Sequence, residues 1–259
     1  RQIYYNGVPQ RYFWLGEKNQ QDHTPFGLRF RFQVKEDIET TCFAVIEKSE
    51  KFIVCLDGER AKLTNDFFMD HSMKKWELPK LSAGEHVLTI EGLYSHEMEL
   101  EDIFIIGNFA VDIDRALTKE RGTLHFGDWT SQGYYHYPGS IVYKFTVPPK
   151  EKEEHRYILD MGEFEATLIE LKVNKKSVTY LLKDSARKVD ITDYLLDREN
   201  TIELCVVGSP RNMFGPFHQT YTGCSRISWE DFRTTGRFYT PGYVLKPYGL
   251  MGQITIFMK

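Results

Sequence analysis

Four aromatic residues, Trp129, Tyr134, Tyr135 and Tyr137, fall within a single stretch of nine residues. Aromatic rings bind the apolar C–H faces of sugars, and nearby polar groups such as the imidazole of His136 bond the sugar hydroxyls. The same kinds of side chain also fill sandwich cores and line domain interfaces. The stretch is therefore a candidate carbohydrate-binding platform, with a purely structural role as the alternative.

A second aromatic group occupies a long stretch that is rich in polar residues and glycine, and it contains Trp229, Phe232, Phe238, Tyr239 and Tyr243. Long loops of this composition carry binding functions more often than strands do. From this group we predict Trp229 as a contact for a sugar.

Between the two groups lies the sequence GSPRNMFGPFH at 208–218, which supplies Arg211, Asn212 and His218. Three hypotheses fit this motif. Its side chains bind a ligand, or they complete the active site of another domain, or they hold a structural loop. In the last case Arg211 bonds buried carbonyl groups. All three residues enter our predicted carbohydrate site, and the other two hypotheses stay open.

The sequence shows no pattern that indicates catalysis, metal binding or cofactor binding. A glycosidase needs two carboxylates that flank the scissile bond, but 37 acidic residues leave no way to choose a pair. The four cysteines form no CxxC pair, and no His and Cys cluster has the spacing of a zinc site. We therefore predict no catalytic residue, no metal and no cofactor.

Charge and hydropathy argue against two classes of partner. Lys and Arg number 33 against 37 Asp and Glu, so the net charge is −4, whereas a nucleic-acid binder usually has a basic excess. The longest apolar runs have about five residues, far short of the roughly 20 that a membrane-spanning helix needs. We predict neither a nucleic-acid nor a membrane partner.

The segments that must position these residues show the alternation of apolar and polar side chains that is typical of β-strands. Residues 28–34 and 141–147 alternate apolar and polar side chains with a period of two, and no segment sustains a helical period. Many short strands separated by Gly, Pro, Asn and Asp are typical of an all-β sandwich or barrel. We predict an all-β chain of two tandem β-sandwiches.

An internal repeat indicates two copies of one module. A strand with an Asx turn at 52–59 is followed by a second strand pattern at 81–90, and the same order returns at 168–175 and 194–204. Each copy then buries its own core between two sheets. We expect a first sandwich over 1–110, a linker over 111–124 and a second sandwich over 125–259.

The second copy carries the sequences ELKVN at 170–174, VDITDYL at 189–195 and ENTI at 199–202. This pattern resembles the jelly-roll, galactose-binding-like domain that flanks the catalytic barrel in family 2 glycoside hydrolases. Lys175 stands where that family usually has Gly. We expect the hairpin to survive, because Asn174 tolerates the left-handed conformation.

Two further stretches of sequence resemble a smaller group of glycoside hydrolases. GSPRNMFGPFH at 208–218 and GDWTSQG at 127–133 are similar to segments of large bacterial glycoside hydrolases, including those of the rhamnosidase type. In the resembling enzymes the catalytic carboxylates lie on a separate α/β barrel. The resemblance therefore implies a non-catalytic accessory region, which binds or orients a saccharide near a catalytic domain outside this sequence.

The implied partners are a carbohydrate and the catalytic domain of the same polypeptide. Two alternatives stay open, namely a scaffold between domains that binds no ligand, and a self-contained glycosidase. The first residues show neither an initial Met nor a signal-peptide pattern. We therefore expect a fragment of a longer protein, and its localisation stays open.

Overall fold

The computed structural model describes residues 23–95, 102–151, 154–220, 227, 229–232 and 234–259. The chain divides into two compact units, a first unit of Arg1–Arg121 and His218–Tyr243, and a second unit of Gly122–Phe217 and Val244–Lys259. Strands dominate both units, which confirms the predicted all-β class. The domain boundaries expected from the sequence stay a prediction. No helix in the described residues is long and apolar enough to cross a membrane.

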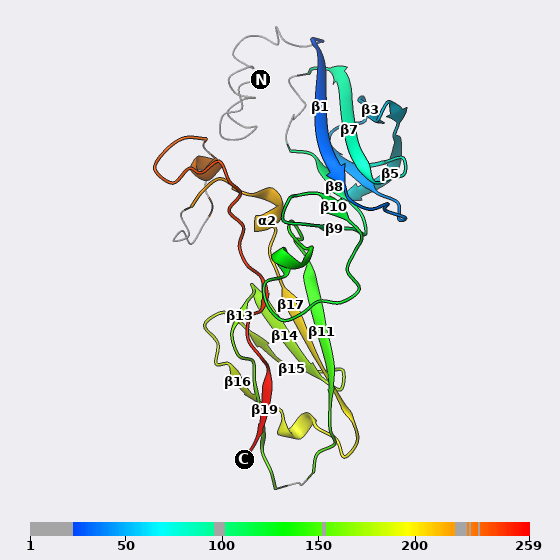
Figure 1. Cartoon of the computed structure of the whole chain (residues 1–259). Helices are drawn as coiled ribbons and strands as arrows, with labels where there is room; N and C mark the ends of the chain where they lie inside the picture. Colours follow the sequence, from blue (N-terminus) through cyan, green and yellow to red (C-terminus); the bar gives the residue numbers. More distant parts are fainter. Residues whose placement is uncertain (1–22, 96–101, 152–153, 221–226, 228, 233) are drawn as a thin grey trace. The chain divides into compact units, whose positions relative to one another are not determined.

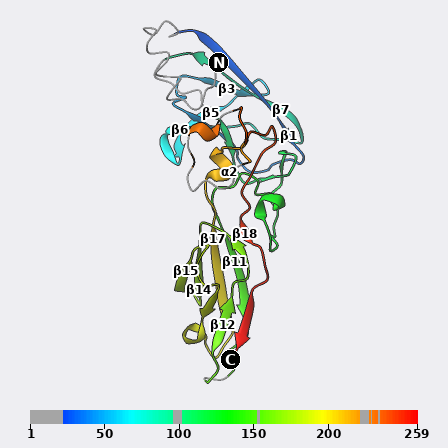
Figure 2. The same ribbon diagram turned by 90° about the vertical axis from the view of Figure 1, so that its left-hand side faces the viewer.

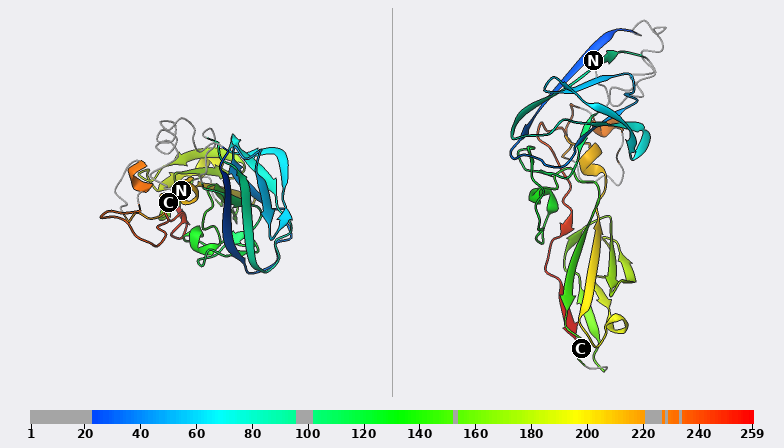
Figure 3. Two further views of the ribbon diagram at one scale, coloured as in Figure 1. Left: turned by 90° about the horizontal axis from the view of Figure 1, so that it is seen from above. Right: turned by 90° about the vertical axis from the view of Figure 1, so that its right-hand side faces the viewer.

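The first unit is a sandwich of two sheets. Its strands are β1 (Pro25–Val34), β2 (Phe43–Glu47), β3 (Ile53–Leu56), β4 (Glu59–Arg60), β5 (Lys62–Phe68), β6 (Asp70–Glu77), β7 (Gly84–Leu93), β8 (Phe104–Ile106), β9 (Ala110–Val111) and β10 (Leu117–Thr118). One sheet has the order β4-β3-β7-β1-β10-β9 and the other the order β5-β6-β2-β8. Figure 1 labels β1, β7 and β3 of the first of these sheets. The antiparallel strands β1 and β7 run side by side when seen from above (Figure 3).

The core of the first unit lies between these sheets. Val54 of β3 and Ile90 of β7 come from one sheet, and they belong to the same buried cluster as Ala44 of β2 and Trp76 of β6 from the other. The Trp76 Nε1–H donates to Ser49 Oγ at 2.8 Å, so the indole enters the core with its polar group satisfied. Burial of such side chains from both faces stabilises the sandwich.

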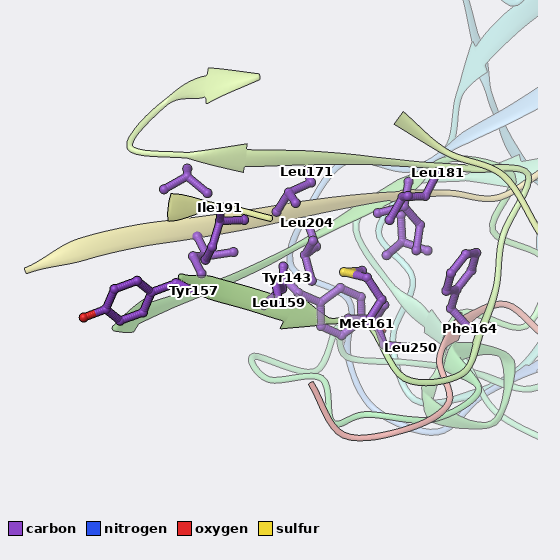
Figure 4. Packing of buried hydrophobic residues seen from close by; sticks show 14 of the residues in the cluster. Tyr143, Tyr157, Leu159, Met161, Phe164, Leu171, Leu181, Ile191, Leu204 and Leu250 are labelled. Atoms are coloured by element: carbon purple, nitrogen blue, oxygen red, sulfur yellow. The ribbon is translucent and has the colours of Figure 1, made fainter. Parts of the chain in front are cut away.

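The second unit is also a sandwich. Its strands are β11 (Ser140–Val147), β12 (Tyr157–Asp160), β13 (Phe164–Glu165), β14 (Leu168–Val173), β15 (Lys176–Leu181), β16 (Lys188–Asp190), β17 (Asn200–Val207), β18 (Gly249–Leu250) and β19 (Thr255–Met258). Its 3-10 helices are η1 (Trp129–Gln132) and η2 (Thr192–Tyr194). The sheets have the orders β11-β17-β14-β15, β16-β12-β19 and β13-β18, and Figure 2 shows the four strands of the first of them side by side. Leu159, Leu171 and Leu204 converge in the core between the sheets (Figure 4).

The repeat predicted from the sequence is present in the fold. The order β4-β3-β7-β1 in the first unit corresponds to β15-β14-β17-β11 in the second, and β6-β2-β8 corresponds to β16-β12-β19. The corresponding strands also follow one another in the same order along the chain. The two units are therefore two copies of one sandwich topology.

The hairpin turns of the two copies also correspond. Asn174 and Lys175 join β14 to β15 with φ angles of 50° and 67°, and Asp57 and Gly58 join β3 to β4 with φ angles of 51° and 86°. Two successive positive φ angles match the right-handed twist of paired strands. The hairpin at Lys175 thus survives without the usual Gly, as expected.

Side-chain hydrogen bonds join each turn to the neighbouring strand, and we call each such set of bonds a turn lock. In the first unit Asp57 Oδ1 accepts from the Val87 N–H at 2.7 Å, and in the second Asn174 Oδ1 accepts from the Thr201 N–H at 3.0 Å. The other side-chain atoms reach the preceding residue of that strand. Asp57 Oδ2 lies 2.6 Å from His86 Nδ1, and Asn174 Nδ2 donates to Asn200 Oδ1 at 2.7 Å.

In both copies the side chain that contacts the turn residue, His86 or Asn200, also contacts the backbone carbonyl four residues earlier in the chain. His86 Nε2 lies 2.7 Å from the Ser82 carbonyl, and Asn200 Nδ2 donates to the Leu196 carbonyl at 3.2 Å. The first lock therefore contains a carboxylate, whereas the second is built from the amide side chains of Asn174 and Asn200.

The two copies differ in the connection before the last strand. Residues 94–103 join β7 to β8, whereas the much longer segment 208–254 joins β17 to β19. This connection contains α2 (Arg211–Phe214), η3 (Trp229–Phe232) and β18, and its middle part, His218–Tyr243, belongs to the first unit. Long insertions between core strands commonly carry function.

Candidate functional site

The first aromatic stretch begins with η1 and lies mostly inside the second unit. Asp128 caps this helix, because its Oδ1 accepts from the Thr130 N–H at 2.9 Å. Trp129 is fully buried and stacks on Tyr248, with 5.7 Å between the ring centroids. The predicted sugar contact of Trp129 is corrected to a role in the core, since a buried ring has no face to offer a ligand.

The three tyrosines of this stretch lie nearer the surface. Tyr134 and Tyr137 pack edge to face with 5.4 Å between centroids, and the Tyr137 hydroxyl donates to the Ser140 carbonyl at 3.1 Å. Tyr135 is half-buried and packs against His136 at 4.8 Å. Tyr137 is the most open of the three, and the sugar contacts of all three stay a prediction.

Arg211 and Asn212 begin the short helix α2. Asn212 is fully buried, where its Nδ2 donates to the Lys246 carbonyl at 2.7 Å and its Oδ1 accepts from the Lys246 N–H at 2.8 Å. The predicted sugar contact of Asn212 is therefore corrected to a structural role, which holds the returning chain. Arg211 is half-buried and its N–H donates to Ser209 Oγ at 3.2 Å. A ligand contact of Arg211 stays a prediction.

His218 lies in a short antiparallel ladder within the long connection. The Thr240 N–H donates to the His218 carbonyl at 2.9 Å, and the Thr220 N–H donates to the Phe238 carbonyl at 2.8 Å. An isolated β-bridge joins the two segments at Tyr239. The ladder thus places His218 beside the aromatic residues at 238 and 239.

Three exposed rings lie at this ladder. Phe238, Tyr239 and Tyr243 keep 39%, 37% and 38% of their surface exposed. The His218 ring centroid is 6.0 Å from that of Tyr239 and 5.1 Å from that of Tyr243. Arg115 places its guanidinium carbon 4.8 Å from the Tyr243 ring centroid. We call His218, Tyr239, Tyr243 and Arg115 the His218 surface.

The hydrogen bond of His218 fixes its tautomer. Nδ1 lies 3.0 Å from the Thr240 carbonyl, and a carbonyl oxygen only accepts, so Nδ1 carries a proton. The neutral ring therefore presents Nε2 as an acceptor, which suits a hydroxyl donor. The His218 surface thus combines ring faces, an acceptor and, in Arg115, a strong donor.

Arg115 is held by the turn between β9 and β10. Its N–H donates to the Asp112 carbonyl at 2.9 Å, while Asp112 Oδ1 accepts from the N–H groups of Asp114 and Ala116 at 3.0 Å each. Lys35 pairs with the carboxylates of Asp112 and Asp114, and its Nζ is 3.0 Å from Asp114 Oδ2. These hydrogen bonds, the one to Asp112 first, raise the pKa of Lys35.

Sequence reasoning found only part of the His218 surface. Arg115 lies in the segment expected to be a linker, far along the chain from Tyr243, and no local pattern joins the two. Tyr239 and Tyr243 belong to the second aromatic group, from which Trp229 was the predicted contact. Trp229 begins η3, and its side chain lies outside the described residues. In the part of the chain that the structure describes, no group of three or more His, Cys, Asp or Glu residues is placed to hold a metal ion.

Comparison with known proteins finds similarity among solved structures. The chain matches no family model and no curated protein. A rhamnosidase from Novosphingobium sp. PP1Y is 15% identical with a TM-score of 0.37, over 93% of this chain and 22% of that one. A Streptomyces avermitilis alpha-L-rhamnosidase complexed with L-rhamnose is 14% identical with a TM-score of 0.28, over 73% of this chain and 22% of that one.

A lectin from Pleurotus ostreatus in its apo form is 10% identical with a TM-score of 0.23, over 74% of this chain and 69% of that one. The chain spans about a fifth of the length of the rhamnosidases that it matches. All of these TM-scores lie below 0.5, and no functional conclusion follows from them.

Proposed function

We propose that this chain is a non-catalytic, carbohydrate-binding accessory region of a larger glycoside hydrolase, and that the His218 surface binds the saccharide. One observation carries the proposal. Two exposed rings, Tyr239 and Tyr243, pack beside His218 on an insertion that the other copy of the sandwich lacks, and Arg115 packs on Tyr243. A core has no use for exposed rings, whereas a sugar-binding surface needs them.

The chemistry of the His218 surface suits a sugar. The exposed Tyr239 ring offers an apolar face against which the C–H groups of a pyranose pack. His218 Nε2 accepts a hydrogen bond from a sugar hydroxyl, and the Arg115 guanidinium donates to a sugar oxygen. Because Arg115 already packs on Tyr243, that ring acts chiefly as a support for the guanidinium.

The accessory role rests on the motifs of the second copy, which resemble those of glycoside hydrolase sandwiches. The described part of the chain consists of strands joined by turns and very short helices. A catalytic barrel needs alternating strands and long helices. In this proposal the hydrolytic centre lies on another domain of the polypeptide, near which this region holds the saccharide.

A glycan array tests the proposal with the whole chain and three variants. Tyr239→Ala removes an exposed ring of the His218 surface, and Tyr137→Ala removes the most open ring of the first aromatic stretch. Tyr180→Ala is the matched control, because Tyr180 of β15 is 59% exposed and lies in the second unit.

We expect wild type, Tyr137→Ala and Tyr180→Ala to retain the same glycan signals, and Tyr239→Ala to lose them. A signal lost only in Tyr137→Ala moves the site to the first stretch and overturns the assignment to the His218 surface. An array without any signal for folded wild type overturns sugar binding itself and favours a scaffold without a ligand.

A further inference from the structure

The charge environment of Arg115 points to the kind of saccharide that fits the His218 surface. Two carboxylates, Asp112 and Asp114, share the turn with Arg115, but both pair with Lys35. Among the described residues no carboxylate oxygen lies within 4.0 Å of the Arg115 guanidinium, which packs on Tyr243 instead. In the part of the chain that the structure describes, its guanidinium therefore packs on a ring and forms no ion pair.

The Arg115 guanidinium lies over the Tyr243 ring and forms no ion pair with the residues that the structure describes. A guanidinium is planar and carries its N–H donors in that plane. Two of its parallel donors match the spacing of two oxygens of a carboxylate or a sulfate. The exposed Arg115 therefore supplies a fork of donors beside the Tyr243 ring.

We propose that the His218 surface binds saccharides that carry an oxyanion, either a uronate carboxylate or a sulfate ester, and that Arg115 bonds this group. The inference rests on the proposed function and adds the ligand class to it. The rings bind the face of the sugar and Arg115 binds its charge. Because the pair forms at an exposed surface, salt weakens the binding.

Calorimetric titration of the whole chain with two matched pairs of oligosaccharides tests the inference. One pair is an oligogalacturonide and its methyl ester, and the other is a sulfated galactan oligosaccharide and its desulfated form. In each pair the sugar is the same and only the charge differs. Arg115→Gln removes the charge, Arg115→Lys keeps the charge without the fork, and Arg198→Gln is the control, because Arg198 is an exposed arginine of the second unit.

We expect the charged member of at least one pair to bind about tenfold more tightly than its neutral partner, as a charge-assisted fork allows. Arg115→Gln removes most of this preference, Arg115→Lys keeps part of it, and Arg198→Gln keeps it all. The pair that shows the preference identifies the oxyanion as carboxylate or sulfate.

Two results would overturn the inference in different ways. If neutral and charged members bind equally and Arg115→Gln changes neither affinity, the ligand class is wrong while sugar binding stands. If no oligosaccharide binds here and none binds on the glycan array, the ligand class and the proposed function are wrong together.

Discussion

Trp129 is the largest fully buried side chain of the second unit. It stacks on Tyr248 and lies so close to Gly208 that a methyl group on that glycine would come within 3.0 Å of the indole. Protein interiors are close-packed, and their side chains relax only partly around a missing neighbour. The indole therefore belongs to the stability of the sandwich and not to its binding chemistry.

We expect Trp129→Ala to lower the free energy of unfolding by about 3–5 kcal/mol, because it removes a large buried ring and leaves a cavity. Urea unfolding measures the change. The control Tyr180→Ala, at an exposed position of β15, shifts the free energy by less than about 0.5 kcal/mol. A folded Trp129→Ala variant with wild-type stability and no glycan binding would contradict this assignment.

At the scale of elements, the two hairpin turns form a matched pair. Gly58 occupies the second turn position in the first unit, and Lys175 occupies it in the second. A left-handed φ costs a residue with a Cβ roughly 1–2 kcal/mol more than it costs glycine. Glycine loses more conformational freedom on folding, and this offsets roughly 0.4–1 kcal/mol of the difference.

Lys175→Gly should therefore raise the free energy of unfolding of the second unit by about 0.5–1 kcal/mol. The reciprocal variant Gly58→Lys should lower that of the first unit by a similar amount, because a Cβ on Gly58 meets no atom within 4 Å and only the backbone is affected. Thermal unfolding of both variants beside wild type gives the two changes. Shifts of the same sign in the two variants would rule out this explanation.

The two turn locks differ in their response to acid. Desolvation raises the pKa of Asp57, but its hydrogen bonds with the Val87 N–H and with His86 outweigh this, so the pKa lies below its ordinary value. A carboxylate with a depressed pKa in the folded state stabilises the fold above the unfolded pKa of about 3.9, and this contribution is lost as pH falls through the folded value. Asn174, which replaces it in the second unit, does not titrate.

Asp57→Asn should therefore reduce the loss of stability of the first unit between about pH 5 and about pH 2, since it removes a group that must be protonated on acidification. Urea unfolding across this range, for the variant and for wild type, measures the difference. Asp197→Asn, at an exposed position of the second unit, serves as the control. An unchanged acid dependence in Asp57→Asn would show that the first lock does not carry it.

At the scale of the whole molecule, each sandwich has a core of its own. The cluster around Leu88 is built from strands of the first unit, and the cluster around Leu204 is built from strands of the second. Removing three carbons from a buried leucine costs about 2–5 kcal/mol.

We expect Leu88→Ala and Leu204→Ala each to lower one melting transition, the one that belongs to the sandwich containing the substitution. Differential scanning calorimetry of the two variants and of wild type separates the transitions. If both substitutions lowered a single common transition by the same amount, the two cores would be one cooperative structure.

Much of the fold follows from patterns in the sequence, and much of the candidate site does not. Alternation along 28–34 and 141–147 predicts strands, and the repeated strand and Asx turn predict two copies. Trp129 lies in a stretch whose composition is that of a binding platform. Its burial depends on Tyr248, which lies far along the chain. The contact between Arg115 and Tyr243 joins a turn to a distant insertion, and such pairs leave no local signal.

The central claim is that exposed rings beside His218 bind a saccharide, and one titration tests it most directly. The glycan that gives the strongest array signal is titrated calorimetrically into wild type, Tyr239→Ala and Tyr180→Ala. We predict that Tyr239→Ala weakens the affinity at least about tenfold, or about 1.4 kcal/mol, with an unchanged melting temperature, and that Tyr180→Ala binds like wild type. Equal affinities for all three proteins would contradict the claim.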